Sequence, residues 1–251
     1  MNPSGPHGLN IDWFTPGCPC CIEEVGLGTG PLPKPTIGKY RHPILDPSES
    51  LRNESTQCQH CYKNKETGVT FFRCSACMVD YYCSKECQRK AWPSHKEDCK
   101  LKSRIPKDEN NPTRRLQRFT GRHRPVLADS AVRALDLSID IERSLRFVLA
   151  IFLRRRDSQK PETSYFATGA DVLPFEAFPP ERCAEMKAMV RKVDEDHKKG
   201  GMDGGLLVLL MCLEDGVINI APAGFTRENL YPPGTPWKGP LLAHLNEGVT
   251  N

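Results

Sequence analysis

One stretch of 42 residues carries eight cysteine and histidine side chains at spacings typical of metal ligands. The pattern is Cys58-x2-Cys61-x12-Cys74-x2-Cys77-x5-Cys83-x3-Cys87-x7-His95-x3-Cys99. Zinc takes four sulfur or nitrogen ligands in a tetrahedron, and a Cys-x2-Cys turn directs two thiolates at one ion. The last two pairs are each four residues apart, so each pair can share one face of a helical turn. Eight ligands therefore predict two zinc ions, each enclosed by four side chains.

The distribution of cysteines favours metal binding over a disulfide framework. Of the 12 cysteines in 251 residues, seven lie between 58 and 99. The first residues, MNPSGPHGLN, lack the basic and apolar segments of a secretory signal. We therefore expect an intracellular protein, nuclear or cytoplasmic, in which clustered cysteines hold metal. The longest apolar run, Leu206–Leu213, is far shorter than the roughly 20 residues of a bilayer span, so no membrane contact is expected.

Composition divides the chain into four parts. Residues 1–54 are rich in proline and glycine without a regular period, which predicts an irregular N-terminal arm. Residues 55–102 contain the ligand pattern and predict a zinc finger. Residues 103–125 predict a basic linker, and residues 126–251 predict a small α+β domain of unknown function. The linker carries the arginines Arg114, Arg115, Arg118, Arg122 and Arg124.

Four segments outline the α+β domain. Residues 130–136 predict a short helix capped by Asp129 or Ser130. Residues 145–153 form an apolar run typical of a buried strand, and residues 179–201 show helical spacing between a proline and a glycine pair. Residues 206–213 and 217–220 flank an Asp-Gly turn, which predicts a hairpin. Four sulfur-containing side chains outside the ligand pattern are expected to fill the core of this domain: Cys183, Met186, Met189 and Cys212.

The segment RCSACMVDYYCSKECQRKAWPSHKEDC, residues 73–99, resembles the MYND-type zinc finger nearly position by position. The resemblance covers 58–99, and the long gap from Cys61 to Cys74 is expected to lengthen a hairpin around Gly68. Spacing alone allows sequential or cross-braced pairing, and the resemblance implies the cross-brace. It implies that the first zinc is held by Cys58, Cys61, Cys83 and Cys87, and the second by Cys74, Cys77, His95 and Cys99. His60 is expected to be a bystander, and whether Cys18, Cys20 and Cys21 bind metal stays open.

Four protein ligands at each site predict a structural role for both ions. A catalytic zinc keeps one coordination position open for water or substrate, whereas a structural zinc does not. A unit of about 45 residues buries too little apolar surface to fold alone, so metal binding supplies the missing stability. We therefore expect no zinc-dependent catalysis.

The finger is expected to act as an interaction module. Residues 78–82 predict a short strand beside a helix from Ser84 to Trp92, ended by Pro93. An exposed strand edge can accept a peptide, and the resemblance implies recruitment of short, proline-rich motifs in partner proteins. The predicted peptide-binding residues are Gln88, Trp92, Tyr81 and Tyr82. The alternative for Trp92 is a place in the small core between the zincs.

Three other functions compete with this interpretation, and one of them is an enzyme that lies wholly in residues 126–251. The arginines of the linker could contact phosphates, which predicts a nucleic-acid-associated transcriptional regulator. Some MYND fingers belong to SET-domain lysine methyltransferases, which resemble one another in an Asn-His motif, but none of the seven histidines here follows an asparagine. The expectation is therefore that the chain is not an enzyme, while the partner, the pathway and the role of residues 126–251 stay open.

Overall fold

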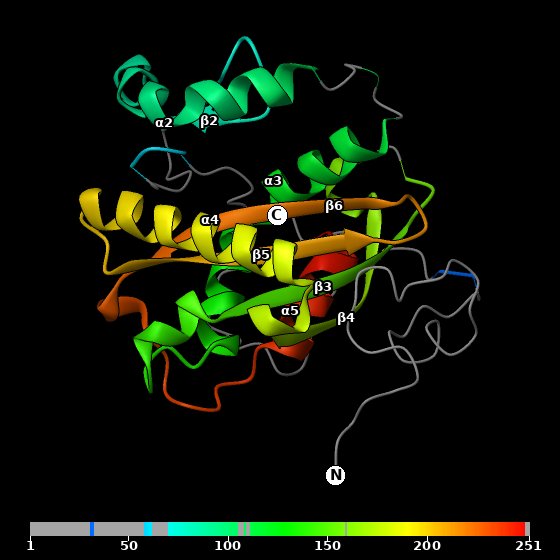
Figure 1. Ribbon diagram of the computed structural model, residues 1–251. Helices are drawn as coiled ribbons and strands as arrows, with labels where there is room; N and C mark the ends of the chain where they lie inside the picture. The colour runs from blue at the N-terminus through cyan, green and yellow to red at the C-terminus, as the bar shows by residue number, and fades with distance from the viewer. Residues whose placement is uncertain are drawn as a thin grey trace.

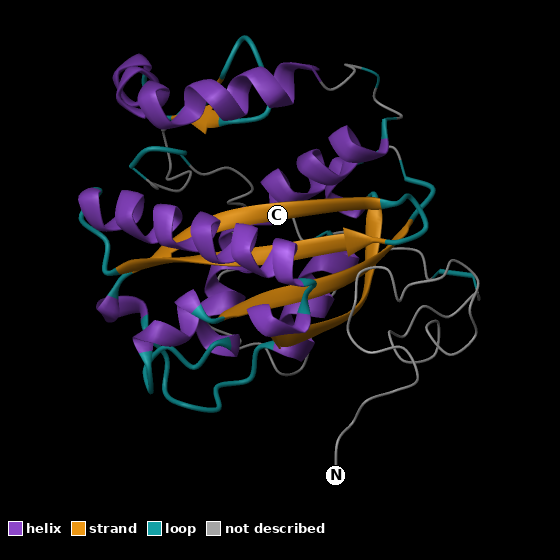
Figure 2. Cartoon of the chain, viewed as in Figure 1, coloured by secondary structure: helices purple, strands orange, loops and turns teal. Residues whose placement is uncertain are grey.

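The computed structural model describes residues 31–32, 58–61, 70–104, 108, 111–158 and 160–248. The zinc-ligand region forms one small body, and a four-stranded sheet covered by helices forms the larger one (Figures 1 and 2). The predicted arm, 1–54, lies outside the described residues apart from 31–32, as do Cys18, Cys20, Cys21 and the hairpin expected around Gly68.

The larger body is built on a mixed sheet with the strand order β4-β3-β5-β6. The strands are β3 (Phe147–Arg155), β4 (Tyr165–Pro174), β5 (Gly204–Cys212) and β6 (Val217–Phe225). β3 pairs with β5 in parallel, and the other two pairings are antiparallel. A parallel pair needs a long crossover connection, and the chain makes it through β4 and helix α4 (Pro180–Lys199).

Helices cover both faces of this sheet, and the central strands are apolar on both sides for that reason. Leu149, Ile151 and Leu153 of β3 pack in the core that includes α3 (Pro112–Ala134) and α5 (Lys238–Glu247). Val148 and Ala150 of β3 pack in a second core with α4. Figure 1 shows α4 in front of the sheet and α5 behind it.

The small body consists of β1 (Phe72–Arg73), β2 (Tyr81–Tyr82) and helix α2 (Lys85–Arg104). β1 and β2 pair antiparallel. Its described core is formed mainly by sulfur ligands: Cys58, Cys74, Cys77 and Cys99, with Tyr82 and Ala91. So small a core cannot offset the conformational entropy lost on folding, and the body therefore depends on what its cysteines bind.

Short 3₁₀ helices complete the described chain: η2 (Ile141–Leu145), η3 (Pro161–Thr163), η4 (Phe175–Ala177) and η5 (Arg227–Asn229). Within the described residues, every helix is too short or too polar to cross a bilayer.

Several predicted elements of the α+β domain are confirmed. The run at 145–153 forms most of β3 from Phe147 onward, the helix predicted at 179–201 corresponds to α4, and the hairpin is formed by β5 and β6. Gly216 has φ +62° in the turn between these strands, the left-handed conformation that made the Asp-Gly pair a turn signal. Met186 and Cys212 are buried as expected, but Met189 is 41% exposed and therefore does not fill the core.

Two helices run further than the sequence indicated, and both contain proline. α2 continues through Pro93 to Arg104 instead of ending at Trp92. α3 begins at Pro112, where the side chain of Asn111 accepts a hydrogen bond from the Arg114 backbone N–H at 3.1 Å, and it runs through Pro125. The predicted domain boundary at 103–125 stays a prediction. The segment itself is not an extended linker, because it contains most of α3. Leu116 and Phe119 are fully buried, and their burial outweighs the local cost of Gly121 and Pro125.

β4 and α5 were missed. β4 contains Gly169, Asp171 and Pro174, residue types that are depleted in strands, and it lies at an edge of the sheet, where such residues are tolerated. The predicted strand at 78–82 is reduced to Tyr81–Tyr82, because Met78 has φ +58°, which is incompatible with a strand.

Candidate metal centre

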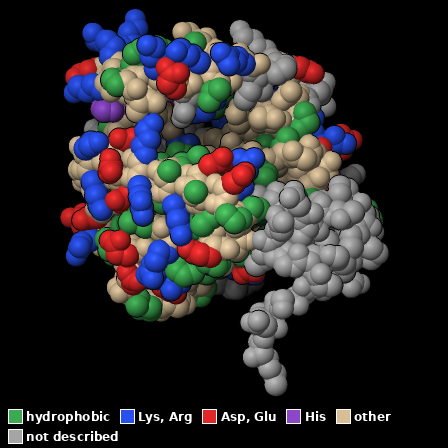
Figure 3. Space-filling view, viewed as in Figure 1, with side chains coloured by type: hydrophobic (Ala, Val, Ile, Leu, Met, Phe, Trp, Pro, Cys, Tyr) green, Lys and Arg blue, Asp and Glu red, His purple; other side chains and the backbone are tan. Residues whose placement is uncertain are grey.

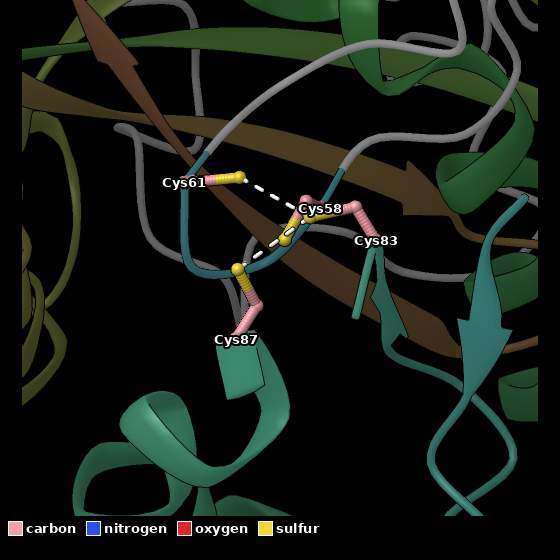
Figure 4. Close-up of side chains that lie close together, drawn as sticks. All are labelled: Cys58, Cys61, Cys83 and Cys87. Atoms are coloured by element: carbon pink, nitrogen blue, oxygen red, sulfur yellow. Dashed lines mark hydrogen bonds between the residues drawn. The ribbon is translucent and has the colours of Figure 1, made fainter. Parts of the chain in front are cut away.

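The first ligand set brings together four cysteines from three places in the chain. Cys58 and Cys61 belong to the turn at 58–61, Cys83 follows β2, and Cys87 lies in the first turn of α2. Figure 4 shows their sulfur atoms pointing toward one another. The Sγ atom of Cys83 lies 3.5 Å from that of Cys61 and 3.5 Å from that of Cys87. The four ligand atoms all lie within 4.8 Å of one another, the separation that a single tetrahedral ion requires.

The second ligand set is buried throughout. Cys74 and Cys77 lie in the tight turn after β1, and His95 and Cys99 lie one turn apart on α2. The Cys74 and Cys99 sulfur atoms are 3.7 Å apart, and the Cys77 Sγ is 3.8 Å from Nε2 of His95. α2 must continue through Pro93 to bring His95 and Cys99 to this site, so the ligand set explains why the helix does not end at that proline.

The two sets interleave along the chain in the cross-braced order implied by the resemblance. Each set offers four sulfur or nitrogen atoms, the donor types that zinc prefers, and leaves no ligand position for a substrate. Burial and the neighbouring sulfur atoms raise the pKa of Cys83, and burial together with the Cys74 side chain raises that of Cys99. A divalent cation between these sulfur atoms would reverse that effect and stabilise the thiolates. The finger is therefore a metal-binding unit whose residues fit zinc.

Asp80 supports the second set, although no pattern in the sequence pointed to it. Its carboxylate lies 2.9 Å from Nδ1 of His95 and accepts a hydrogen bond from Lys102 Nζ at 2.9 Å. Burial alone would raise the pKa of Asp80, but these two partners hold it well below its usual range. The contact fixes the His95 ring so that Nε2 faces the sulfur ligands, an arrangement common around zinc-bound histidines. The one sequence signal for this role of Asp80 was the presence of an acidic residue just after the Cys-x2-Cys turn.

Helix α3 holds the finger against the larger body. Nη2 of Arg114 donates to the carbonyl oxygen of Cys77 at 3.4 Å, and Arg124 donates to the side chain of Gln59. The backbone N–H of Gln59 in turn donates to the carbonyl oxygen of Tyr81 at 2.9 Å. Arg114 and Arg124 therefore act as structural contacts to the finger, a role that the linker interpretation did not include.

The four residues predicted to bind a peptide lie in different environments. Trp92 is 44% exposed on α2, with its ring centroid 6.0 Å from that of His95, and Gln88 is half-buried on the same helix. Tyr81 is also half-buried, and the Arg73 guanidinium lies 5.0 Å from its ring centroid. Tyr82 is 1% exposed and packs on the His95 ring. Since neighbouring strand residues face opposite sides, Tyr82 points into the finger and is unavailable to a peptide. His60 belongs to neither ligand set.

Comparison with known proteins identifies the finger. The family model named MYND finger matches residues 58–99. A SET and MYND domain-containing protein of Dictyostelium discoideum is 48% identical over 89 residues, which are 34% of this chain and 16% of that protein. The human histone-lysine N-methyltransferase SMYD3 is 47% identical over 62 residues, which are 24% of this chain and 14% of the enzyme. No solved structure matches the chain.

These relatives correct two predictions. The chain was expected to be an interaction module, or a nucleic-acid-associated regulator, and not an enzyme. Several relatives are histone-lysine or lysine N-methyltransferases from animals and plants, and this finding contradicts both expectations. The absence of an Asn-His motif was too weak a ground for excluding a methyltransferase, because a single short pattern does not define an activity.

The likeness to these enzymes is confined to the MYND region and spans about a sixth or less of their length. MYND fingers as a class mediate protein interactions. The matched family model, the relatives with SET and MYND domains, and the two complete ligand sets all agree that residues 58–99 of this chain form a MYND finger.

Proposed function

We propose that this chain acts in protein lysine methylation, the activity named for several relatives of its finger. The observation that carries the proposal is the 47% identity over 62 residues to a human histone-lysine N-methyltransferase. The finger itself would stand outside the chemistry, because protein side chains supply all four ligands at each centre. Transfer of the methyl group would therefore take place elsewhere in the protein.

The finger would contribute by engaging a protein and by binding two zinc ions, one in each ligand set. Trp92, Gln88 and Tyr81 lie at least partly at its surface, so they are the side chains available to a protein partner through this face. A half-exposed tryptophan offers a large apolar area at a low entropic cost, as at many protein interfaces.

A methyl-transfer assay with the full, zinc-loaded chain tests the proposal. The chain is incubated with tritium-labelled S-adenosylmethionine and core histones, and label on lysine is measured by scintillation and mass spectrometry. We expect transfer above the level without protein, and less transfer by a Trp92→Ala variant that retains its zinc. Absence of label from a folded chain with both ions bound would overturn the proposal.

A further inference from the structure

A pocket of about 250 Å³ lies between the finger and helix α3. The finger lines it with Arg73, Met78, Val79 and Tyr81, and α3 lines it with Arg114, Gln117, Arg118, Gly121 and Arg122. Counted from Arg114, the other α3 positions lie three, four, seven and eight residues further on, so the five positions share one face of the helix. Neither body contains the pocket alone, since each supplies one wall.

The described lining is strongly basic. Four of its nine residues are arginines and none is acidic. Figure 3 shows Lys and Arg side chains gathered on the finger at the top of the view. A pocket lined in this way favours a bound anion over a cation.

Local contacts hold two of these arginines in place. Arg114 is only 8% exposed and donates to the carbonyl oxygen of Cys77 at 3.4 Å. The guanidinium of Arg73 lies 5.0 Å from the centroid of the Tyr81 ring. Their positions are thus fixed before any ligand arrives, which reduces the entropic cost of binding.

Gly121 keeps part of the space open. A Cβ atom at this position would meet nothing within 4 Å, so the helix presents bare backbone there. Glycine inside a helix is destabilising relative to alanine. A methyl group therefore fits at position 121 without a clash, and a longer side chain there would extend from a residue that lines the pocket.

We propose that this pocket binds an acidic peptide segment of a partner protein through an oxyanion, either a glutamate carboxylate or a phosphorylated side chain. The guanidinium fork matches both oxyanions and can bind them bidentately. Met78, Val79 and Tyr81 supply apolar walls for the rest of the peptide. Such binding is separate from methyl transfer, and either can occur without the other.

The geometry favours a peptide over a nucleic acid. A nucleic-acid backbone needs a groove of charge that follows its length, and single strands also need exposed aromatic faces for their bases. Here the arginines converge on one small pocket, and the Arg73 guanidinium already lies over the Tyr81 ring.

Fluorescence anisotropy with the full, zinc-loaded chain tests the proposal. The probes are fluorescein-labelled peptides of one sequence that differ only in a central segment of glutamates, a phosphoserine, or glutamines. A DNA oligonucleotide and inorganic phosphate serve as competitors. We expect the glutamate or the phosphoserine peptide to bind, the glutamine peptide not to bind, and affinity to fall with added salt.

Three variants locate the site. Gly121→Glu places a carboxylate in the pocket and should weaken peptide binding at least tenfold, whereas Gly121→Ala should bind like the unchanged protein. Arg73→Gln should weaken binding roughly tenfold, as expected for one charge-assisted hydrogen-bond partner. Zinc content, measured by native mass spectrometry, should be the same in all three.

Several results would overturn the proposal. These are failure of both acidic peptides to bind, equal binding by Gly121→Glu and Gly121→Ala, or displacement by inorganic phosphate at concentrations equal to those of the peptides. Binding of the oligonucleotide more tightly than either peptide, with the same sensitivity to Gly121→Glu, would assign the pocket to nucleic acid instead.

Discussion

The finger and the sheet body are stabilised by different interactions, although α3 joins them. The buried residues of the finger include few apolar side chains and five metal ligands: Cys58, Cys74, Cys77, His95 and Cys99. The sheet body has two apolar cores, one on each face of a sheet whose central strand β5 is buried at every position. The first depends on a bound ion and the second on apolar surface removed from water.

This difference determines what each body can tolerate. Loss of one ligand opens a whole zinc centre, because the other three cannot saturate the ion. Loss of one apolar side chain from the sheet body removes only part of a core shared among many residues. We therefore expect the two bodies to respond to different perturbations.

The largest expected effect is that of zinc removal. Chelation should unfold the finger, because binding of structural zinc contributes on the order of 10 kcal/mol in comparable units. Hydrogen exchange should become fast across 74–99 and stay slow across 147–153 and 204–212. Native mass spectrometry should find two ions in the untreated chain, fewer in Cys74→Ser, and two in the control Cys183→Ser. Continued protection of 74–99 after chelation would show that the finger does not depend on metal.

A substitution at Gly205 should affect only the sheet body. A Cβ atom there would lie 2.8–2.9 Å from backbone atoms of Val193 and Asp194, so β5 and α4 would have to separate. Gly205→Ala should therefore lower the free energy of unfolding by about 3 kcal/mol, measured by urea denaturation, without loss of zinc. The matched control is Gly121→Ala, where the added methyl group meets nothing and stability should rise slightly. Equal stability of the two variants would contradict the close packing of α4 on β5.

The finger is the more predictable body, because the types and spacing of its residues identify its metal ligands. Cysteines and a histidine at metal-binding intervals, with the resemblance to a family, are enough to indicate both ligand sets. The role of Asp80 was not predicted, because a single acidic residue forms no recognisable sequence pattern. Tyr82 was misplaced because a strand of two residues shows no alternation from which its buried face can be identified.

The sheet body was predictable only where the local pattern agreed with the tertiary environment. β3 and β5 are apolar runs, and the turn at Gly216 is a strong local signal. α3 contains Gly121 and Pro125, which indicate a break, and the helix persists because its buried side chains pack on the sheet. The segment that carries the arginines of this helix was interpreted as a linker. Their contacts with the finger join residues far apart in the sequence, so no local pattern indicates them.

The smallest expected effect is that of Asp80, which holds the zinc ligand His95 in place but does not bind the ion itself. Asp80 contacts His95 through Nδ1, on the side of the ring away from Nε2, and is also paired with Lys102. Asp80→Asn retains a hydrogen-bond acceptor but loses the charge, so zinc affinity should fall tenfold to a hundredfold, about 1.4–2.7 kcal/mol. Competition with a chromophoric chelator measures this change. Glu86→Gln is the matched control, because Glu86 is exposed and pairs only with Lys90 among the contacts described. If both variants bind zinc equally well, the carboxylate does not orient His95, and the zinc sites of the finger depend on their eight ligands alone.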